Sequence, residues 1–160
     1  MHDLESLTMT MGKHTTMRNT SSKAKTDKKL HPLDARYVDV AELTWEPTSF
    51  EGIHTKVLYA DAKTGMSTIL FKMDPGAVVP QHEHTALEQT YLLEGSLVDE
   101  QGAVTAGNYV WRPAGNSHKA WAPDGAVFLS FFMKPNRFLS GAKFFTEQES
   151  DADETRSKDD

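Results

Sequence analysis

Short apolar or alternating runs of strand length recur through the middle of this 160-residue chain. Between them stand turn sequences rich in Asp, Pro and Gly. Strands that recur about every 8–12 residues between such turns predict an all-β sandwich or barrel. Only residues 40–45 fit a short helical turn. The predicted strands cover residues 56–60, 66–73, 90–98, 109–112 and 126–133, and the turns cover residues 61–65, 74–76, 99–102, 113–115 and 123–125.

The two ends of the chain differ from this central region. Residues 1–30 are rich in Thr, Ser, Lys and Met and show neither strand nor helix periodicity. Residues 146–160 are strongly acidic and almost free of apolar side chains. Such segments bury too little surface to offset the entropy of ordering them. We therefore expect disordered tails at residues 1–30 and 146–160, and one domain at residues 31–145.

Net charge and cysteine content limit the classes of function that the chain can have. The net charge is −6, which disfavours a nucleic-acid binder that needs a basic stripe. No run approaches the ~18 apolar residues of a membrane span, and no apolar stretch near the start is typical of a secretory signal. We therefore expect a soluble cytoplasmic protein without nucleic-acid or membrane partners. Because the chain has no cysteine, any metal site must use histidines and carboxylates.

Three of the seven histidines stand in a spaced pattern. His82 and His84 are two residues apart, so on a strand their imidazoles leave the same face while Glu83 faces away. A short loop at residues 85–87 then allows Glu88 to approach from the neighbouring strand. His118 follows a Pro-Ala-Gly turn and supplies another imidazole from a distant stretch. Three imidazoles and a carboxylate suit one borderline divalent metal and leave positions open for water or substrate.

The other four histidines lack spaced partners. His2, His14 and His31 fall in or beside the N-terminal tail, and His54 stands alone after Gly52. We expect all four to be solvated.

These residues resemble the two signature motifs of the cupin superfamily (RmlC-like), G-x5-H-x-H-x3-E-x6-G and G-x5-P-x-G-x2-H-x3-N. The first motif is matched throughout, from Gly76 to Gly95. The second begins at Gly107 and is matched through His118, whereas Ala122 stands in place of the usual Asn. The resemblance implies a compact jelly-roll β-barrel over residues 37–135. It also implies a metal inside the barrel, bound by the residues that match the motif, namely His82, His84, Glu88 and His118.

A narrower resemblance lies outside the motifs, in the runs at residues 45–47, 56–61, 93–99 and 134–138. They are similar to a group that contains acetylacetone-cleaving and dihydroxyacetophenone dioxygenases and the cupin domains of ChrR-type anti-sigma factors. The enzymes of that group are iron(II) dioxygenases that hold their metal with three histidines and do not rely on a ligating Glu. Glu88 therefore stays open as either a metal ligand or a base that removes an acidic substrate proton.

Alternation along the strands predicts the pocket around this metal. Thr90 and Leu92 share the face of Glu88, and Ala120 shares that of His118. The predicted pocket is small and mostly apolar, with no second acid and no Ser–His pair for nucleophilic hydrolysis. Arg112 is either a solvated or salt-bridged side chain or is placed to meet an anionic substrate at the barrel mouth. Tyr91 and Trp121 face the other way, toward other strands or a second subunit, and a homodimer is expected.

Two classes of function fit this pattern. We favour an enzyme, an Fe(II) dioxygenase that cleaves a C–C bond in a small β-dicarbonyl or aryl ketone substrate. The alternative is a non-catalytic zinc cupin that senses or binds a small molecule. A metal-assisted isomerase or lyase acting in the same pocket is a further possibility, and Mn, Ni or Co are alternative metals.

Overall fold

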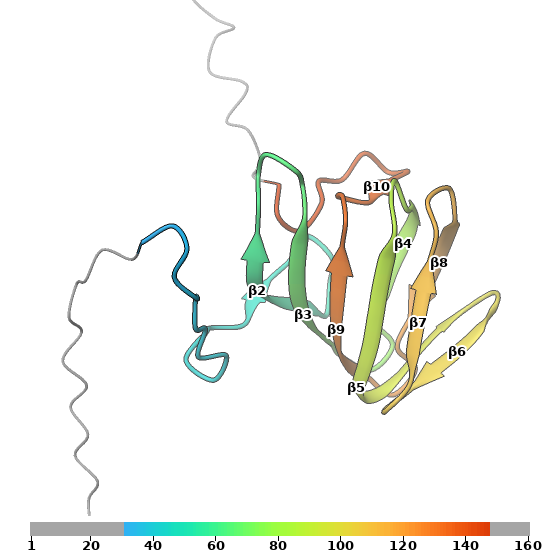
Figure 1. The fold of residues 1–160 in the computed structure, drawn as a ribbon. Coiled ribbons are helices and arrows are strands. Elements are labelled where there is room, and N and C mark those ends of the chain that lie inside the picture. Colours follow the sequence, from blue (N-terminus) through green and yellow to red (C-terminus); the bar gives the residue numbers. More distant parts are fainter. Residues whose placement is uncertain (1–30, 148–160) are drawn as a thin grey trace, which may run out of the picture. The chain divides into compact units, whose positions relative to one another are not determined.

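The computed structural model describes residues 31–147, which contain ten β-strands and no helix (Figure 1). Residues 31–36 belong to one unit and residues 37–147 to another. In the first unit the backbone N–H of Asp34 donates to the carbonyl oxygen of His31 at 3.0 Å. All strands lie in the second unit, and no described segment forms a helix able to cross a membrane. The predicted tail at residues 1–30 falls outside the described residues. So does the predicted tail at residues 146–160, except for residues 146 and 147.

The strands of the second unit are all antiparallel and belong to two sheets that share one long strand, β5. The larger sheet has the order β1-β2-β3-β9-β5-β7, and the smaller one the order β10-β4-β8-β5-β6. Figure 1 shows the smaller sheet curling behind the larger one. This architecture confirms the predicted all-β jelly-roll barrel. The strands are β1 (Glu46–Pro47), β2 (Ile53–Ala60), β3 (Ser67–Met73), β4 (Val78–Glu83), β5 (Glu88–Asp99), β6 (Gly102–Thr105), β7 (Tyr109–Arg112), β8 (Ser117–Trp121), β9 (Ala126–Phe132) and β10 (Arg137–Phe138).

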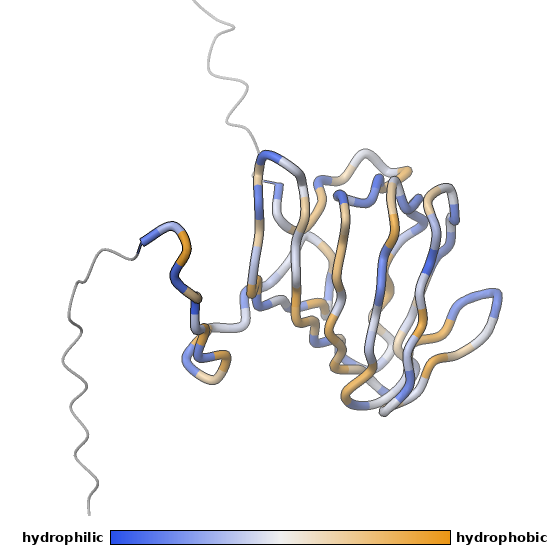
Figure 2. Tube along the Cα trace, viewed as in Figure 1, coloured by the Kyte–Doolittle hydropathy of each residue, from blue (hydrophilic) through white to orange (hydrophobic). Residues whose placement is uncertain are grey.

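Alternation of apolar side chains explains why these segments form strands around a common core. In β3, Ile69, Phe71 and Met73 are buried at every second position, while the residues between them face outward. β9 alternates in the same way, and its Phe128 stacks on Phe71 with ring centroids 5.0 Å apart. Figure 2 shows hydrophobic colour along the strands and hydrophilic colour at the tips of the β2–β3 and β5–β6 turns.

A β-bulge divides β5 into two halves. The pairing of β5 with β9 shifts register between Leu92 and Glu94. Gly95 follows at a φ of +69°, and a Cβ atom there would lie 2.0 Å from the carbonyl oxygen of Gly125. Only glycine allows the two strands to approach this closely. The bulge also exchanges the two faces of the strand, because it inserts one unpaired residue.

Two details differ from the sequence-based expectation. Residues 40–45 contain a single hydrogen-bonded turn, in which the N–H of Glu42 donates to the carbonyl of Asp39, and no helix. The Asp39 side chain accepts from the N–H of Ala41, and the chain then extends into β1. The second difference is that β5, which carries Glu88, is not a hydrogen-bonded neighbour of β4, because β8 lies between them.

Candidate metal centre

Three buried imidazoles converge inside the barrel. His82 on β4 and His118 on β8 are direct cross-strand partners, and His84 follows the end of β4. Their exposed fractions are 4%, 3% and 0%, and their ring centroids lie 4.6–5.1 Å apart. One nitrogen from each ring lies within 4.8 Å of the others. The structure thus brings together three of the four predicted ligands, which come from two separated stretches of the chain.

Each of these rings has a hydrogen-bond acceptor behind its Nδ1 atom. The Nδ1 of His82 lies 2.8 Å from the carbonyl oxygen of Pro80, to which it can donate. The Nδ1 of His84 is 3.0 Å from Glu88 Oε2, and the Nδ1 of His118 is 3.0 Å from Asp99 Oδ2. These last two pairs are at hydrogen-bond distance, although the angle at the nitrogen is outside the range of a hydrogen bond in both. Such partners fix the tautomer that leaves Nε2 free to bind a metal.

The surroundings of the Nε2 atoms indicate whether this site fits a metal ion. Among the described residues, the Nε2 atoms of His84 and His118 are buried and have no hydrogen-bond partner. Buried polar nitrogens without partners are costly unless a ligand satisfies them. Three imidazoles form a donor set for borderline divalent ions such as Fe, Zn, Mn, Co and Ni. The residues present therefore fit one such ion.

Glu88 lies in a dense hydrogen-bond network beside His84. Its Oε2 accepts from the side-chain amide of Asn136 at 2.8 Å, and its Oε1 accepts from the hydroxyl of Thr90 at 3.0 Å. Thr90 in turn lies 2.7 Å from the hydroxyl of Ser130. Burial opposes ionisation of this carboxyl, but His84 and the Asn136 amide outweigh it and lower the pKa of Glu88 to about 2. The carboxylate is therefore ionised, and both of its oxygens already accept hydrogen bonds from neighbouring side chains.

Asp99 is a second acid at the site, which alternation along the sequence did not predict. Its Oδ2 accepts from Arg112 Nη2 at 2.6 Å and also contacts His118, and both Asp99 and Arg112 are buried. Desolvation raises the pKa of Asp99, but the hydrogen bonds from Arg112 and from the backbone N–H of Gln101 lower it overall. The prediction that no second acid lies near the pocket was wrong, because the bulge in β5 turns Asp99 inward.

Burial lowers the pKa of two of the three clustered histidines. Desolvation is the largest cause at His118, followed by the positive charge of Arg112, and together they lower its pKa to about 4. Desolvation also lowers the pKa of His82. Both rings are therefore neutral at physiological pH, which is the form that binds metals.

The remaining predicted pocket residues are buried as alternation suggested. Thr90 and Leu92 are fully buried and Ala120 is 2% exposed, whereas Tyr91 is 42% exposed on the opposite face. Glu83 also faces outward, where it forms an ion pair with Arg137. Arg112 is salt-bridged to Asp99, one of the two alternatives considered for it.

The cavity next to the imidazoles is small. Its volume is about 30 Å³, and its walls include His82, Glu88, Arg112, His118 and a group of phenylalanines. A water molecule needs ~10–15 Å³ of such space, so the cavity has room for about two or three waters. Ligand pockets for organic molecules are usually about 300–1,000 Å³. An organic substrate can enter only if part of the wall moves.

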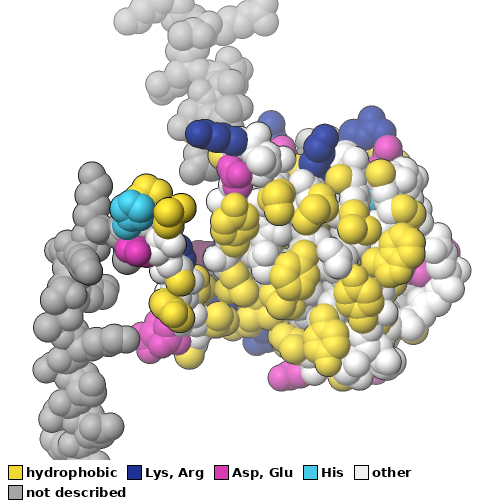
Figure 3. All heavy atoms as spheres, viewed as in Figure 1, with side chains coloured by type: hydrophobic (Ala, Val, Ile, Leu, Met, Phe, Trp, Pro, Cys, Tyr) yellow, Lys and Arg dark blue, Asp and Glu magenta, His cyan; other side chains and the backbone are white. Residues whose placement is uncertain are grey.

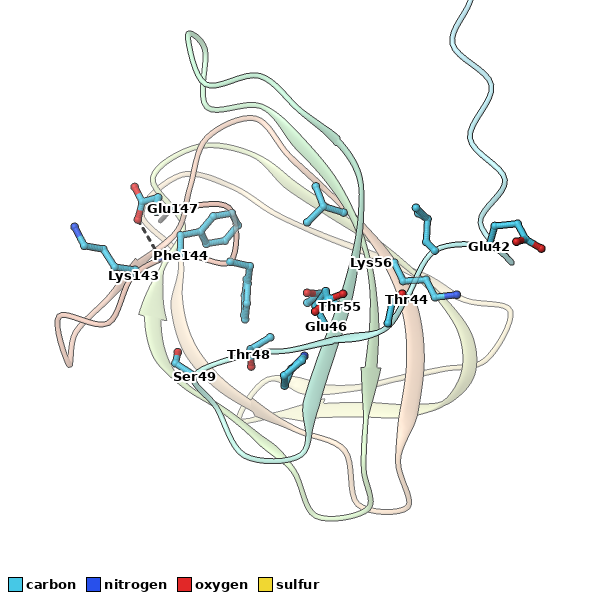
Figure 4. A pocket seen from close by; sticks show the side chains of 14 residues that line it. Glu42, Thr44, Glu46, Thr48, Ser49, Thr55, Lys56, Lys143, Phe144 and Glu147 are labelled. Carbon is cyan, nitrogen blue, oxygen red and sulfur yellow. Dashed lines mark hydrogen bonds between the residues drawn. The ribbon is translucent and has the colours of Figure 1, made fainter. Parts of the chain in front are cut away.

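A larger groove lies outside this cavity (Figure 4). It has a volume of about 680 Å³ and runs between β1, β2 and the C-terminal segment that carries Lys143 and Glu147. No histidine lines it. Phe145 borders both the groove and the small cavity, and it is the residue that their walls have in common.

Comparisons with known proteins agree with this geometry. Residues 33–136 match the family described as the ChrR Cupin-like domain. The search of curated proteins finds no match.

Solved structures show the same fold at low identity. A candidate acetylacetone dioxygenase from Methylibium petroleiphilum has a TM-score of 0.63 and 22% identity, covering 72% of this chain and 90% of that one. An acetylacetone dioxygenase from Acinetobacter johnsonii has a TM-score of 0.59 and 21% identity, with coverages of 73% and 86%. The anti-sigma factor ChrR of Rhodobacter sphaeroides, solved in complex with SigE, has a TM-score of 0.52 and 22% identity, and the match covers 58% of this chain and 51% of ChrR.

Proposed function

The chain belongs to the ChrR cupin-like family, and on that premise we propose that it is an Fe(II) dioxygenase. Its substrate would be a small β-dicarbonyl or aryl ketone in which it cleaves a C–C bond. The observation that carries the proposal is the cluster of three buried imidazoles, each with an acceptor behind Nδ1 and beside an apolar cavity. Two of the similar solved structures are described as acetylacetone dioxygenases, one of them as a candidate.

His82, His84 and His118 would hold the ion. When bound, iron(II) supplies attraction for the oxygens of an enolised dicarbonyl and redox chemistry with O₂. The surrounding phenylalanines, among them Phe71, Phe128 and Phe132, give the cavity an apolar wall and limit the water it can hold. The chain's own contribution is therefore a fixed geometry of the three ligands inside an apolar cavity.

We assign Glu88 to orienting His84. Both of its oxygens are already engaged, and a carboxylate whose pKa is about 2 is a weak base at neutral pH. The sequence-based alternatives, a fourth metal ligand or a base, remain open to experiment. Replacing Glu88 by Gln separates them, because an orienting role tolerates the amide better than a role as ligand or base does.

The zinc-binding sensor stays as the second candidate, because a cavity of about 30 Å³ leaves little room for a substrate. ChrR itself was solved with a sigma factor. Both candidates use a small-molecule ligand and need no nucleic acid. A ferrous centre also fits the reducing cytoplasm, which is the location we propose.

Metal analysis of untagged protein, followed by oxygen uptake with a panel of β-diketones after iron loading, distinguishes the two. Iron-dependent oxygen consumption supports the dioxygenase, whereas bound zinc and no consumption after iron loading supports the sensor. His118→Ala should lose the metal in either case, because one of three ligands is removed. His54→Ala is the matched control, since His54 lies outside the cluster. Retention of stoichiometric metal by His118→Ala would contradict the site.

A further inference from the structure

The outward surface of the larger sheet carries two cross-strand rows of mostly apolar side chains, which we call the outer sheet face. One row follows the register Tyr109, Tyr91, Leu129 and Leu70, across β7, β5, β9 and β3. The other follows Trp111, Gln89, Phe131, Thr68 and Tyr59, and reaches β2. Leu93, in the bulge of β5, and Val127 extend the face at one end. These strands turn their other side toward the metal cavity, so the face is distinct from the site.

Large apolar side chains on this face are unusually exposed. Trp111 is 58% exposed, Tyr59 52%, Tyr109 51%, Leu93 46%, Tyr91 42% and Phe131 38%. On the face of the molecule drawn in Figure 3, hydrophobic side chains gather over the strands of the larger sheet. Since a large side chain buries ~150–250 Å², these six leave on the order of 400–700 Å² of apolar surface open. With the half-buried Leu70, Val127 and Leu129, the face approaches the ~800 Å² per partner of a standard interface.

Charge is absent from the two rows. Neither row contains an acidic or basic side chain, and the hydroxyl of Tyr109 is already satisfied by Gln89 Oε1 at 2.8 Å. The nearest charges lie at the edges of the face. Lys72 and Glu94 flank Val127. Lys56 on β2 pairs with Leu70 at the end of the first row, where its Nζ donates to the carbonyl oxygen of Val40. A charged partner would therefore find nothing to pair with at the centre of the face. Two copies of this face can meet without placing like charges opposite each other, even though the whole chain carries a net charge of −6.

We propose that the outer sheet face is the interface of a homodimer related by a two-fold axis. The occupant is a second copy of this chain, because the area approaches that of one side of a stable dimer and the surface is depleted of charge at its centre. Aromatic residues dominate it, as they dominate interface hot spots. This proposal is independent of the metal and of the reaction.

The first test is sedimentation velocity on the full chain at about 50 µM, a concentration well above a micromolar dissociation constant. The unmodified protein should sediment as a dimer. Tyr91→Lys and Phe131→Lys should each be monomeric, because a lysine at the centre of the contact would be buried without a partner. Leu139→Lys is the matched control: Leu139 is 60% exposed but lies outside the face, so this variant should stay dimeric.

A second test uses the lack of cysteine in the chain. Single cysteines at Tyr91, Leu129 or Phe131 should give disulfide-linked dimers under mild oxidation at the positions nearest the two-fold axis. A cysteine at Leu139 should not. A monomeric unmodified protein, lysine variants that remain folded dimers, or preferential cross-linking through Leu139 would each overturn the proposal. If a lysine variant fails to fold, the cysteine series decides.

Discussion

Asp99 joins the metal centre to a buried positive charge. Its Oδ2 lies 2.6 Å from Arg112 Nη2 and 3.0 Å from His118 Nδ1, and its Oδ1 accepts from the backbone N–H groups of Gln101 and Gly102. One carboxylate thus closes the β5–β6 turn, neutralises the guanidinium and orients a metal ligand. Groups behind a metal-bound histidine commonly set its orientation and basicity.

Asp99→Asn should therefore weaken metal binding without removing a ligand. The amide keeps the shape but loses the charge, so we expect affinity for Zn(II) or Co(II) to fall by about 10–100-fold. Metal titration with a competing chelator measures this. Glu83→Gln is the control, because Glu83 forms an exposed ion pair with Arg137 on the outer side of β4, and such pairs contribute little. Equal affinities for the unmodified protein and Asp99→Asn would show that Asp99 has no such role.

The two acids at this site differ in how far the sequence could predict them. Glu88 belongs to a motif of fixed spacing, and alternation from it correctly placed Thr90 and Leu92 inside the barrel. Continued past residue 92, the same alternation points Asp99 outward, whereas the bulge reverses the faces and buries it. Asn136, which donates to Glu88, lies in a loop 48 residues away, where no periodicity exists to locate it. Motif residues on regular strands could thus be predicted, but residues positioned by a bulge or a loop could not.

At the scale of elements, the C-terminal segment after β10 forms one wall of the interior. Phe144 is buried, and its backbone N–H donates to Glu147 Oε2 at 2.9 Å (Figure 4). Phe145 packs against Phe71 with ring centroids 4.9 Å apart, and also against Phe50 and Phe138. Because Phe145 borders both hollows, we expect its ring to influence whether the metal cavity opens into the groove.

Phe145→Ala should join the small cavity to the groove. For the proposed diketone substrates, we expect bulky aryl diketones to gain at least about tenfold in kcat/KM relative to acetylacetone, about 1.4 kcal/mol in selectivity. The visible spectrum of the Co(II)-loaded protein reports binding of the same diketones, so the change in selectivity can also be measured without turnover. Phe50→Ala is the control, since Phe50 borders neither hollow but loses similar aromatic contacts. Unchanged selectivity in Phe145→Ala would place the entrance elsewhere.

At the scale of the whole molecule, folding keeps neutral imidazoles and ionised carboxylates inside the barrel. The pKa of His118 is lowered by burial to about 4, and that of His82 is lowered as well. The unfolded chain, in contrast, takes up protons on its histidines near pH 6.5. Below that pH the unfolded state binds more protons than the folded state, so acid favours unfolding. Glu88 acts in the same direction at lower pH, since its stabilisation is lost between about pH 4.5 and 2.

The metal-free protein should therefore be most stable above about pH 6.5 and lose stability as the pH falls toward 4. One pKa unit corresponds to about 1.4 kcal/mol, so the loss attributable to His118 should be on the order of 2–3 kcal/mol. Urea unfolding at pH 7.5, 5.5 and 4.5 measures it. His118→Gln should flatten the dependence, because the glutamine cannot take up a proton in the unfolded chain. Saturating Zn(II) should raise stability most at pH 7.5, since protons compete with the metal for the same nitrogens. A metal-free protein whose stability is constant from pH 7.5 to 4.5 would contradict the burial of neutral imidazoles on which the site depends.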